Sequence, residues 1–255
     1  MSQRCMGWKG SLNSLVRIMT YDRLTSKDEL AHKFDHTNLQ QDATEADITL
    51  LCREAAKCGF FAVCVNPCYV GLARDLLSGP SVKVCTVTGF PLGANTARTK
   101  LAETEEALRH GADEIDVVMN VGLFKSGKTA EVETELGQIV STIKSVGVNK
   151  ICKVIIESGV LNAKEIELAC KIVNKSGADF IKTSTGFGKA GGASIEALEI
   201  INRHRGQLRI KAAGGIRNLH MALAMLRAGA DRLGASQSVS IVEELQRTHA
   251  GQTNG

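Results

Sequence analysis

The chain has 255 residues, 44% of them hydrophobic, and is therefore long enough to bury a sizeable core. Its formal net charge is only +4 and its aromatic content 4%, which argues against a nucleic-acid-binding face with stacking aromatic side chains. The sequence has no apolar run near the about 18 residues that a transmembrane helix needs, so we expect no membrane partner.

The cysteines and histidines indicate neither a disulfide framework nor a metal centre. Several of the eight cysteines lie in apolar, strand-like segments, as Cys64, Cys85 and Cys152 do, and the sequence contains no CxxC pair. We therefore expect reduced thiols and a cytoplasmic protein. The six histidines show no HxH or HExxH spacing, so the sequence predicts no metal site.

In chain order, the first segment differs in composition from the rest. Residues 1–25 are rich in basic residues and serine, with no acidic residue before Asp22, and we interpret them as an N-terminal extension. The same composition leaves an organellar transit peptide as the alternative. We predict a single domain over residues 26–248 and a flexible tail over 249–255.

Short apolar segments then alternate with longer amphipathic ones, and glycine usually marks the change from helix to strand. We predict strands at 33–37, 60–65, 82–88, 113–119, 151–157, 178–184, 208–213 and 231–235. We predict helices at 44–58, 67–77, 95–110, 129–146, 162–176, 193–204, 217–228 and 236–248. Three of the junctions repeat the same tripeptide, as Gly111-Ala112-Asp113, Gly177-Ala178-Asp179 and Gly229-Ala230-Asp231.

Alternating strands and helices indicate parallel pairing through right-handed crossovers. Eight such units in a chain of this length favour a closed (β/α)8 TIM barrel of class α/β, with an open doubly wound sheet as the alternative. A dinucleotide-binding fold would need Gly-x-Gly-x-x-Gly after its first strand, and the sequence has none there.

Two lysines on apolar strands suggest the chemistry. Lys182 and Lys211 each precede a loop rich in glycine, serine or threonine, although lysine is disfavoured inside a sheet. If both point into the barrel, each ammonium group favours the neutral form of the other, and a lysine with a lowered pKa is a nucleophile for Schiff-base catalysis. The alternative is that one of them pairs with an acid as a structural ion pair.

Two acids and a set of loops complete the candidate site. Asp116 could transfer protons through water and decide which lysine stays cationic, and Asp35 could hold Lys211 charged. The glycine-rich loops after the last three strands are typical of a phosphate site, because glycine lets backbone N–H groups approach an anion. Ordinary tight turns are the alternative for each loop. The candidate phosphate ligands in these loops are Thr185, Gly186, Gly214, Gly215 and Ser236.

Taken together, these segments resemble the deoxyribose-phosphate aldolases, a family of class I aldolases, over roughly residues 33–240. The motifs that carry the resemblance are Phe34-Asp35-His36-Thr37-Asn38-Leu39, Thr88-Gly89-Phe90-Pro91-Leu92-Gly93-Ala94-Asn95-Thr96, Asp113-Glu114-Ile115-Asp116-Val117-Val118, Lys153-Val154-Ile155-Ile156-Glu157, Phe180-Ile181-Lys182-Thr183-Ser184-Thr185-Gly186, Lys211-Ala212-Ala213-Gly214-Gly215-Ile216 and Arg232-Leu233-Gly234-Ala235-Ser236.

The resemblance implies reversible cleavage of 2-deoxy-D-ribose 5-phosphate to D-glyceraldehyde 3-phosphate and acetaldehyde, in deoxyribonucleotide catabolism. It implies that Lys182 forms the imine, that Lys211 lowers its pKa, and that Asp116 moves protons. It also places Cys64 near the substrate and implies the barrel, independence of metal or organic cofactor, and a homo-oligomer, commonly a dimer.

Two rival functions remain open at this stage, and one feature departs from the family pattern. Another imine-forming sugar-phosphate aldolase or a transaldolase would keep Lys182, and a barrel that binds a phosphosugar without turnover is the non-enzymatic rival. Some family members end in a tyrosine that assists proton transfer, whereas the last tyrosine here is Tyr69.

Overall fold

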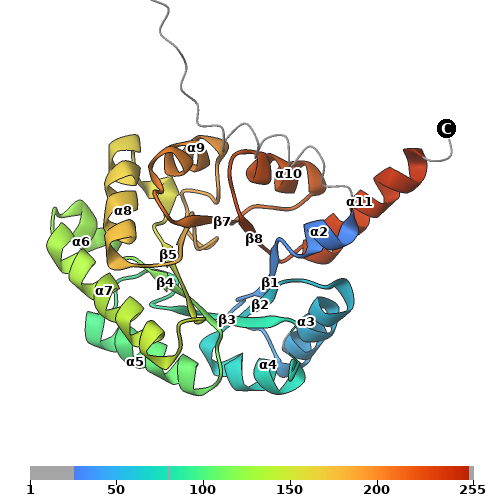
Figure 1. The fold of residues 1–255 in the computed structure, drawn as a ribbon, viewed down its shortest axis with the longest axis horizontal. Coiled ribbons are helices and arrows are strands. Elements are labelled where there is room, and N and C mark those ends of the chain that lie inside the picture. Colours follow the sequence, from blue (N-terminus) through green and yellow to red (C-terminus); the bar gives the residue numbers. More distant parts are fainter. Residues whose placement is uncertain (1–25, 80, 253–255) are drawn as a thin grey trace, which may run out of the picture.

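The predicted strands form a closed barrel in the computed structural model, which describes residues 26–79 and 81–252. Neighbouring strands are parallel, and the first strand pairs with the eighth, which excludes the open sheet. Figure 1 shows the strands at the centre and the helices around them, as in a (β/α)8 TIM barrel. The strands are β1 (Phe34–Asn38), β2 (Ala62–Val65), β3 (Lys83–Thr88), β4 (Glu114–Val118), β5 (Ile151–Ile155), β6 (Phe180–Lys182), β7 (Arg209–Ala213) and β8 (Arg232–Ala235).

The predicted helices are also present, with ends displaced by a few residues, as is usual for helix boundaries. Two short helices, α2 (Lys27–Ala31) and α6 (Val121–Lys125), were not predicted from the sequence. The helices are α2 (Lys27–Ala31), α3 (Glu45–Cys58), α4 (Val70–Leu76), α5 (Ala97–Arg109), α6 (Val121–Lys125), α7 (Thr129–Val146), α8 (Ala163–Ser176), α9 (Ile195–His204), α10 (Leu219–Arg227) and α11 (Ser238–Gln252). Single 3₁₀ turns lie at Pro67–Tyr69 and Ser158–Val160.

The two ends of the chain bear on the predicted domain limits. The last helix, α11, runs to Gln252 and so continues past residue 248, where the sequence suggested that the barrel ends. The predicted extension over residues 1–25 and the last three residues of the predicted tail lie outside the described residues. Of the helices in the described part, none combines the length and the apolar character that crossing a bilayer demands.

Local sequence signals explain how the helices start and stop. Helix α3 begins with a capping box in which Thr44 and Asp47 each bind the other's backbone N–H group, and α8 begins in the same way at Asn162. Helix α3 ends at Gly59, which has a φ of 71° in the left-handed region that glycine adopts with little strain.

The repeated Gly-Ala-Asp tripeptide marks the amino-terminal end of a strand. The carboxylates of Asp113, Asp179 and Asp231 accept hydrogen bonds from the backbone N–H groups of Val84, Cys152 and Ile210, respectively. Each acid therefore binds the strand beside its own. The same three carboxylates pair with cationic side chains, those of Arg74, Lys144, Lys150 and Arg205.

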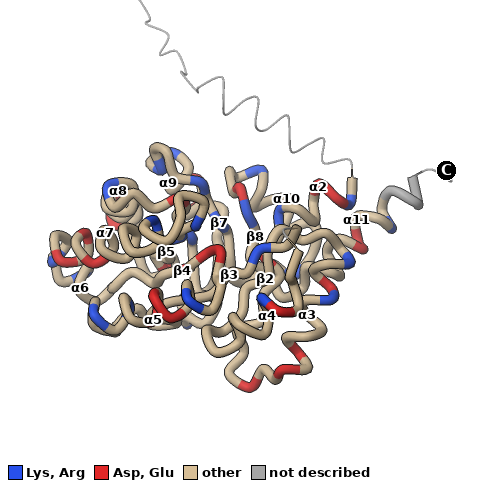
Figure 2. The backbone as a smooth tube through the Cα atoms, turned by 60° about the horizontal axis from the view of Figure 1, so that its bottom comes forward, with Lys and Arg blue, Asp and Glu red and all other residues tan. Residues whose placement is uncertain are grey.

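Buried apolar side chains fill the layer between the barrel and the helices, and a smaller apolar cluster lies inside the barrel beside β2 and β3. Figure 2 shows basic and acidic residues interspersed along the chain rather than collected in one region. The unusual charges of this molecule are instead inside the barrel, where bulky aliphatic side chains ordinarily dominate.

Candidate active site

Alternate residues of the strands point into the barrel, and this periodicity brings the predicted catalytic residues together. Asp35, Asp116, Lys182 and Lys211 come from β1, β4, β6 and β7, and each is at least 97% buried. Lys182 is the last residue of its strand, which ends two residues before the predicted limit at residue 184, whereas the other three lie within their strands. The site therefore extends down into the barrel rather than lying only at its mouth.

Asp116 is the centre of this arrangement. Its Oδ2 atom is 2.8 Å from the Nζ atom of Lys182 and 2.8 Å from that of Lys211, so the two amines share one oxygen. Its Oδ1 atom accepts a hydrogen bond of 2.7 Å from Lys153. We expected Asp116 to select between two lysines by contacting one of them; it contacts both, and a third as well.

Three further charged residues belong to the same cluster, and we did not assign them a role from the sequence. Lys153 pairs with Glu114 at 2.6 Å, and Arg232 pairs with Asp35 at 2.6 Å and with Glu114 at 3.4 Å. All three are buried. The signal that could have found them is their position: each is a charged residue at an inward position of an apolar strand.

The number of charges indicates which amine the cluster stabilises least. Four cationic side chains face the three carboxylates of Asp35, Glu114 and Asp116. Lys153 lies within 4 Å of all three carboxylates and Lys211 of two, but Lys182 of one only.

A buried charge is stable only when nearby opposite charges compensate it, and Lys182 has the fewest carboxylate partners of these cations. Its positive charge therefore receives the least compensation. Arg232 cannot lose its proton at all. Lys182 is therefore the amine that the cluster leaves most available for reaction.

The pKa directions of its neighbours agree with this assignment. Burial alone would lower the pKa of Lys211, but the carboxylates of Asp116 and Asp35 raise it above its ordinary value. Burial would raise the pKa of Asp116, yet Lys153, Lys182 and Lys211 hold it well below its ordinary value. These directions leave Asp116 ionised and Lys211 cationic near neutral pH.

Lys182 opens onto a cavity of about 250 Å³ that also contains the predicted phosphate ligands. The loops after β6 and β7 touch there: a Cβ atom on Gly192 would lie 2.1 Å from the carbonyl oxygen of Gly214. Glycine at both positions therefore allows two backbones to come together at the edge of the cavity. Its lining includes Lys182, Thr185, Gly186, Phe187, Gly214, Gly215, Arg217 and Ser236.

Glu157 supports one of these loops. Its backbone has a φ of 51°, which makes Glu157 the one non-glycine residue with a positive φ in the described part of the chain, and the residue is 91% buried. Its Oε2 atom accepts hydrogen bonds from the Thr185 hydroxyl at 2.6 Å and from the Thr185 N–H group at 3.2 Å. We infer that this strained, buried acid fixes the start of the loop after β6.

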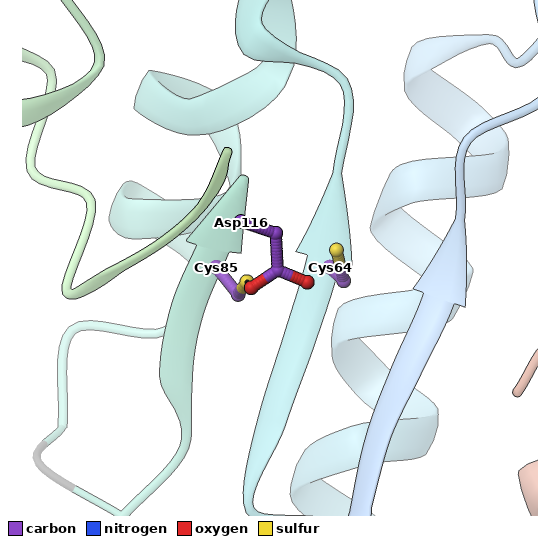
Figure 3. A group of neighbouring side chains, drawn as sticks. All are labelled: Cys64, Cys85 and Asp116. Carbon is purple, nitrogen blue, oxygen red and sulfur yellow. The ribbon is translucent and has the colours of Figure 1, made fainter. Parts of the chain in front are cut away.

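Cys64, which the resemblance placed near the substrate, does not line the cavity. It is fully buried inside the barrel, beside Cys85 and Asp116, as Figure 3 shows. The sulfur of Cys64, the sulfur of Cys85 and a carboxylate oxygen of Asp116 all lie within 4.8 Å of one another. Cys64 therefore lies beside the Asp116 carboxylate and not among the residues that line the cavity at Lys182.

Known proteins resemble this chain over most of its length. A family model described as DeoC/LacD family aldolase matches residues 30–243. A deoxyribose-phosphate aldolase from Caldanaerobacter subterraneus is 47% identical over 223 residues, which cover 87% of this chain and 96% of that protein. One from Aciduliprofundum boonei is 48% identical over 219 residues, covering 86% and 97%, respectively.

Solved structures agree. An aldolase called QR15 is 40% identical with a TM-score of 0.81 and covers 87% of this chain and 98% of its own. A deoxyribose phosphate aldolase from Aeropyrum pernix, described as a unique tetrameric structure, is 34% identical with a TM-score of 0.84 and covers 93% and 99%.

Proposed function

The chain belongs to the DeoC/LacD family of aldolases, and we propose that it reversibly cleaves 2-deoxy-D-ribose 5-phosphate to D-glyceraldehyde 3-phosphate and acetaldehyde. One observation carries the assignment of its nucleophile: Lys182 is the least-paired amine of a buried cluster and lines the cavity. The names and the identity of the curated relatives support the substrate.

In the proposed reaction, the neutral amine of Lys182 adds to the C1 aldehyde of the open-chain sugar and loses water to form an imine. The C3 hydroxyl then gives up its proton, the C2–C3 bond breaks, and the bonding electrons move into the imine to give an enamine. Glyceraldehyde 3-phosphate leaves at this point. The enamine takes a proton at C2, and water hydrolyses the resulting imine to release acetaldehyde and the free lysine.

Asp116 is the group that we propose to move these protons, through a water molecule. Its contacts with Lys182 and Lys211 support the role, because a carboxylate between two amines can exchange a proton with the reacting one while the other stays cationic. Asp35 supports Lys211 through a contact of 2.5 Å. We assign Cys64 a place next to this proton path rather than a direct contact with the phosphate.

The phosphate of the substrate is proposed to bind at the glycine-rich rim of the cavity. Thr185, Gly186, Gly214, Gly215 and Ser236 line one space with Lys182. Backbone N–H groups and a hydroxyl suit a phosphate dianion, and holding it there would bring C1 to the amine.

We propose that the reaction needs no metal and no organic cofactor. The donor atoms of Cys64, Cys85 and Asp116 are close enough together to bind a metal ion. However, Asp116 already accepts hydrogen bonds from three lysines, whose charges would repel a divalent cation. Activity that survives dialysis against EDTA supports this proposal, whereas activity restored only by an added metal contradicts it.

We further propose that the protein acts in the cytoplasm as a homo-oligomer and does not bind nucleic acid. The tetramer described for the Aeropyrum pernix protein makes a tetramer the alternative to a dimer. Light scattering of the purified protein coupled to size-exclusion chromatography distinguishes the monomer, which would contradict the proposal, from the dimer and the tetramer.

The direct test is release of acetaldehyde from 2-deoxy-D-ribose 5-phosphate, followed through NADH oxidation by alcohol dehydrogenase. We expect turnover by the wild type and none above background by Lys182→Met. This variant should fold, because it leaves three cations for three carboxylates in the cluster. Turnover of the variant at the wild-type rate contradicts the assignment, and no release by the folded wild type favours the non-catalytic binder.

A further inference from the structure

The barrel interior also holds a pair of thiols whose closeness the proposed reaction does not require. Cys64 of β2 and Cys85 of β3 are direct partners in the parallel register and are both fully buried. Figure 3 shows the two side chains on neighbouring strands with the Asp116 carboxylate between them in the view. Both sulfur atoms lie within 4.8 Å of one another and of that carboxylate.

Their position in the sheet suits a disulfide. Neighbouring strands lie about 4.7–4.9 Å apart, and disulfides join residues whose Cα atoms are about 4.4–6.8 Å apart. Register partners also present their side chains on the same face of the sheet. Among the described cysteines, these two are the ones paired with each other in a strand register, so a bond between them would need little movement of the backbone.

The surroundings give the two thiols different character. The neighbouring Cys85 thiol lowers the pKa of the Cys64 thiol, and Lys211 and Lys182 lower it too, whereas burial and the Asp116 carboxylate raise it. Burial raises the pKa of the Cys85 thiol well above its ordinary value, as do Cys64 and Asp116. Cys64 is therefore the nucleophile of the pair and Cys85 the protonated partner.

We propose that Cys64 and Cys85 are a site of reversible oxidation by hydrogen peroxide, and that a disulfide between them inactivates the enzyme. The Cys64 thiolate attacks one peroxide oxygen, the O–O bond breaks, and a sulfenic acid and hydroxide form. The Cys85 sulfur then attacks the Cys64 sulfur and expels the hydroxyl group, which leaves as water with the Cys85 proton. Two thiols and one peroxide give one disulfide and two waters.

Loss of activity follows from the contacts that Cys85 makes now. Its thiol donates a hydrogen bond to Asp116 Oδ1 at 3.2 Å, and Lys153 Nζ lies 3.2 Å from its sulfur. A disulfide removes the S–H donor and turns the sulfur toward Cys64. Because the disulfide removes a hydrogen bond to the charged carboxylate of Asp116, we expect the rate of cleavage to fall at least about tenfold.

The test treats the wild-type protein with hydrogen peroxide and measures the cross-link and the activity in the same samples. Tryptic peptides mapped without reduction should show residues 58–74 joined to residues 84–98, with the bond located at Cys64 by fragmentation, because Cys58 and Cys68 share its peptide. Dithiothreitol should reverse the cross-link and restore activity in parallel. The activity readout rests on the proposed aldolase function, whereas the peptide map does not.

Two comparisons make the result decisive. Cys152 and Cys170 are as deeply buried but have pKa values raised to about 12, and they should remain free thiols. The Cys85→Ser variant keeps an O–H donor for Asp116. Peroxide should cause no loss of its activity, relative to its own untreated rate, that dithiothreitol reverses. The proposal is overturned if peroxide inactivates the wild type without a Cys64–Cys85 cross-link, or if the cross-link forms and activity is unchanged.

Discussion

Replacing Lys211 by methionine tests the electrostatics of the site, because it removes one cation and keeps a side chain of similar length. The Nζ atoms of Lys182 and Lys211 are each 2.8 Å from Asp116 Oδ2. The two Nζ atoms are therefore at most 5.6 Å apart, twice 2.8 Å. Two unit charges at that separation repel each other by about 3 kcal/mol at an effective dielectric constant of about 20. The substitution removes that repulsion and also leaves more of the carboxylate charge to stabilise Lys182. Both effects favour the ammonium form of Lys182.

Imine formation needs the neutral amine, so its pH midpoint should move upward in Lys211→Met. About 3 kcal/mol corresponds to about two pH units, or about a hundredfold loss of rate at pH values below the wild-type midpoint, with recovery at high pH. The assay is the pH dependence of the first-order rate of imine formation with acetaldehyde in stopped flow. The variant should fold, because three cations then face three carboxylates.

A buried lysine elsewhere provides the matched control. Lys100 is fully buried and its Nζ atom is 2.6 Å from Glu135. Lys100→Met should destabilise the protein by about 3–5 kcal/mol, because it leaves a buried carboxylate unpaired, but should leave the pH midpoint where it is. An unchanged midpoint in Lys211→Met, or an equal shift in both variants, would refute the reasoning.

Three further predictions concern the loops and the barrel wall. Glu157→Ala removes the acceptor of two hydrogen bonds from Thr185 and should raise KM for the phosphorylated substrate about tenfold, with a smaller change in kcat. Glu157→Gln keeps an acceptor and should have a KM near that of the wild type, so equal defects in the two variants would contradict the positioning role. Gly192→Ala places its new methyl group against the Gly214 carbonyl oxygen and should lower the melting temperature. It should also weaken the binding of phosphorylated deoxyribose more than that of unphosphorylated deoxyribose, which steady-state kinetics with both sugars measures. Burial lowers the pKa of His36 below 6.5, although Glu54 opposes this, so the neutral imidazole stabilises the fold above pH 6.5 and this stabilisation is lost as the pH falls. Between pH 7.5 and pH 5.5, the free energy of unfolding measured in urea should therefore fall less in His36→Gln than in the wild type. Equal decreases in the two proteins would contradict this prediction.

The helices and strands could be predicted because the period of the apolar residues and the glycines at the helix ends are local signals. The strand at residues 180–182 is only three residues long, yet the Gly-Ala-Asp before it and the loop after it marked its place. What the tripeptide does was not predictable, since Asp179 binds the N–H of Cys152, which is 27 residues away in the sequence. The short helix Val121–Lys125 was missed because five residues are too few to show a helical period.

The candidate catalytic residues could be named individually from the sequence, but their arrangement could not. Two lysines on apolar strands and an acid on a third suggested the chemistry. Lys153 was overlooked because the apolar segment Ile151–Ile155 reads as an ordinary buried strand, and its role depends on Asp116 and Glu114 of the neighbouring strand. Pairing across a barrel depends on three-dimensional proximity, which a single sequence does not contain.

The most direct test of the central claim is to locate the covalent adduct. The protein is incubated with acetaldehyde, reduced with borohydride and digested with trypsin. We predict one ethyl group on Lys182, which blocks cleavage there and yields a peptide of residues 176–189. An ethyl group on Lys153 or Lys211, with Lys182 unmodified, would contradict the claim that the least-paired amine is the nucleophile.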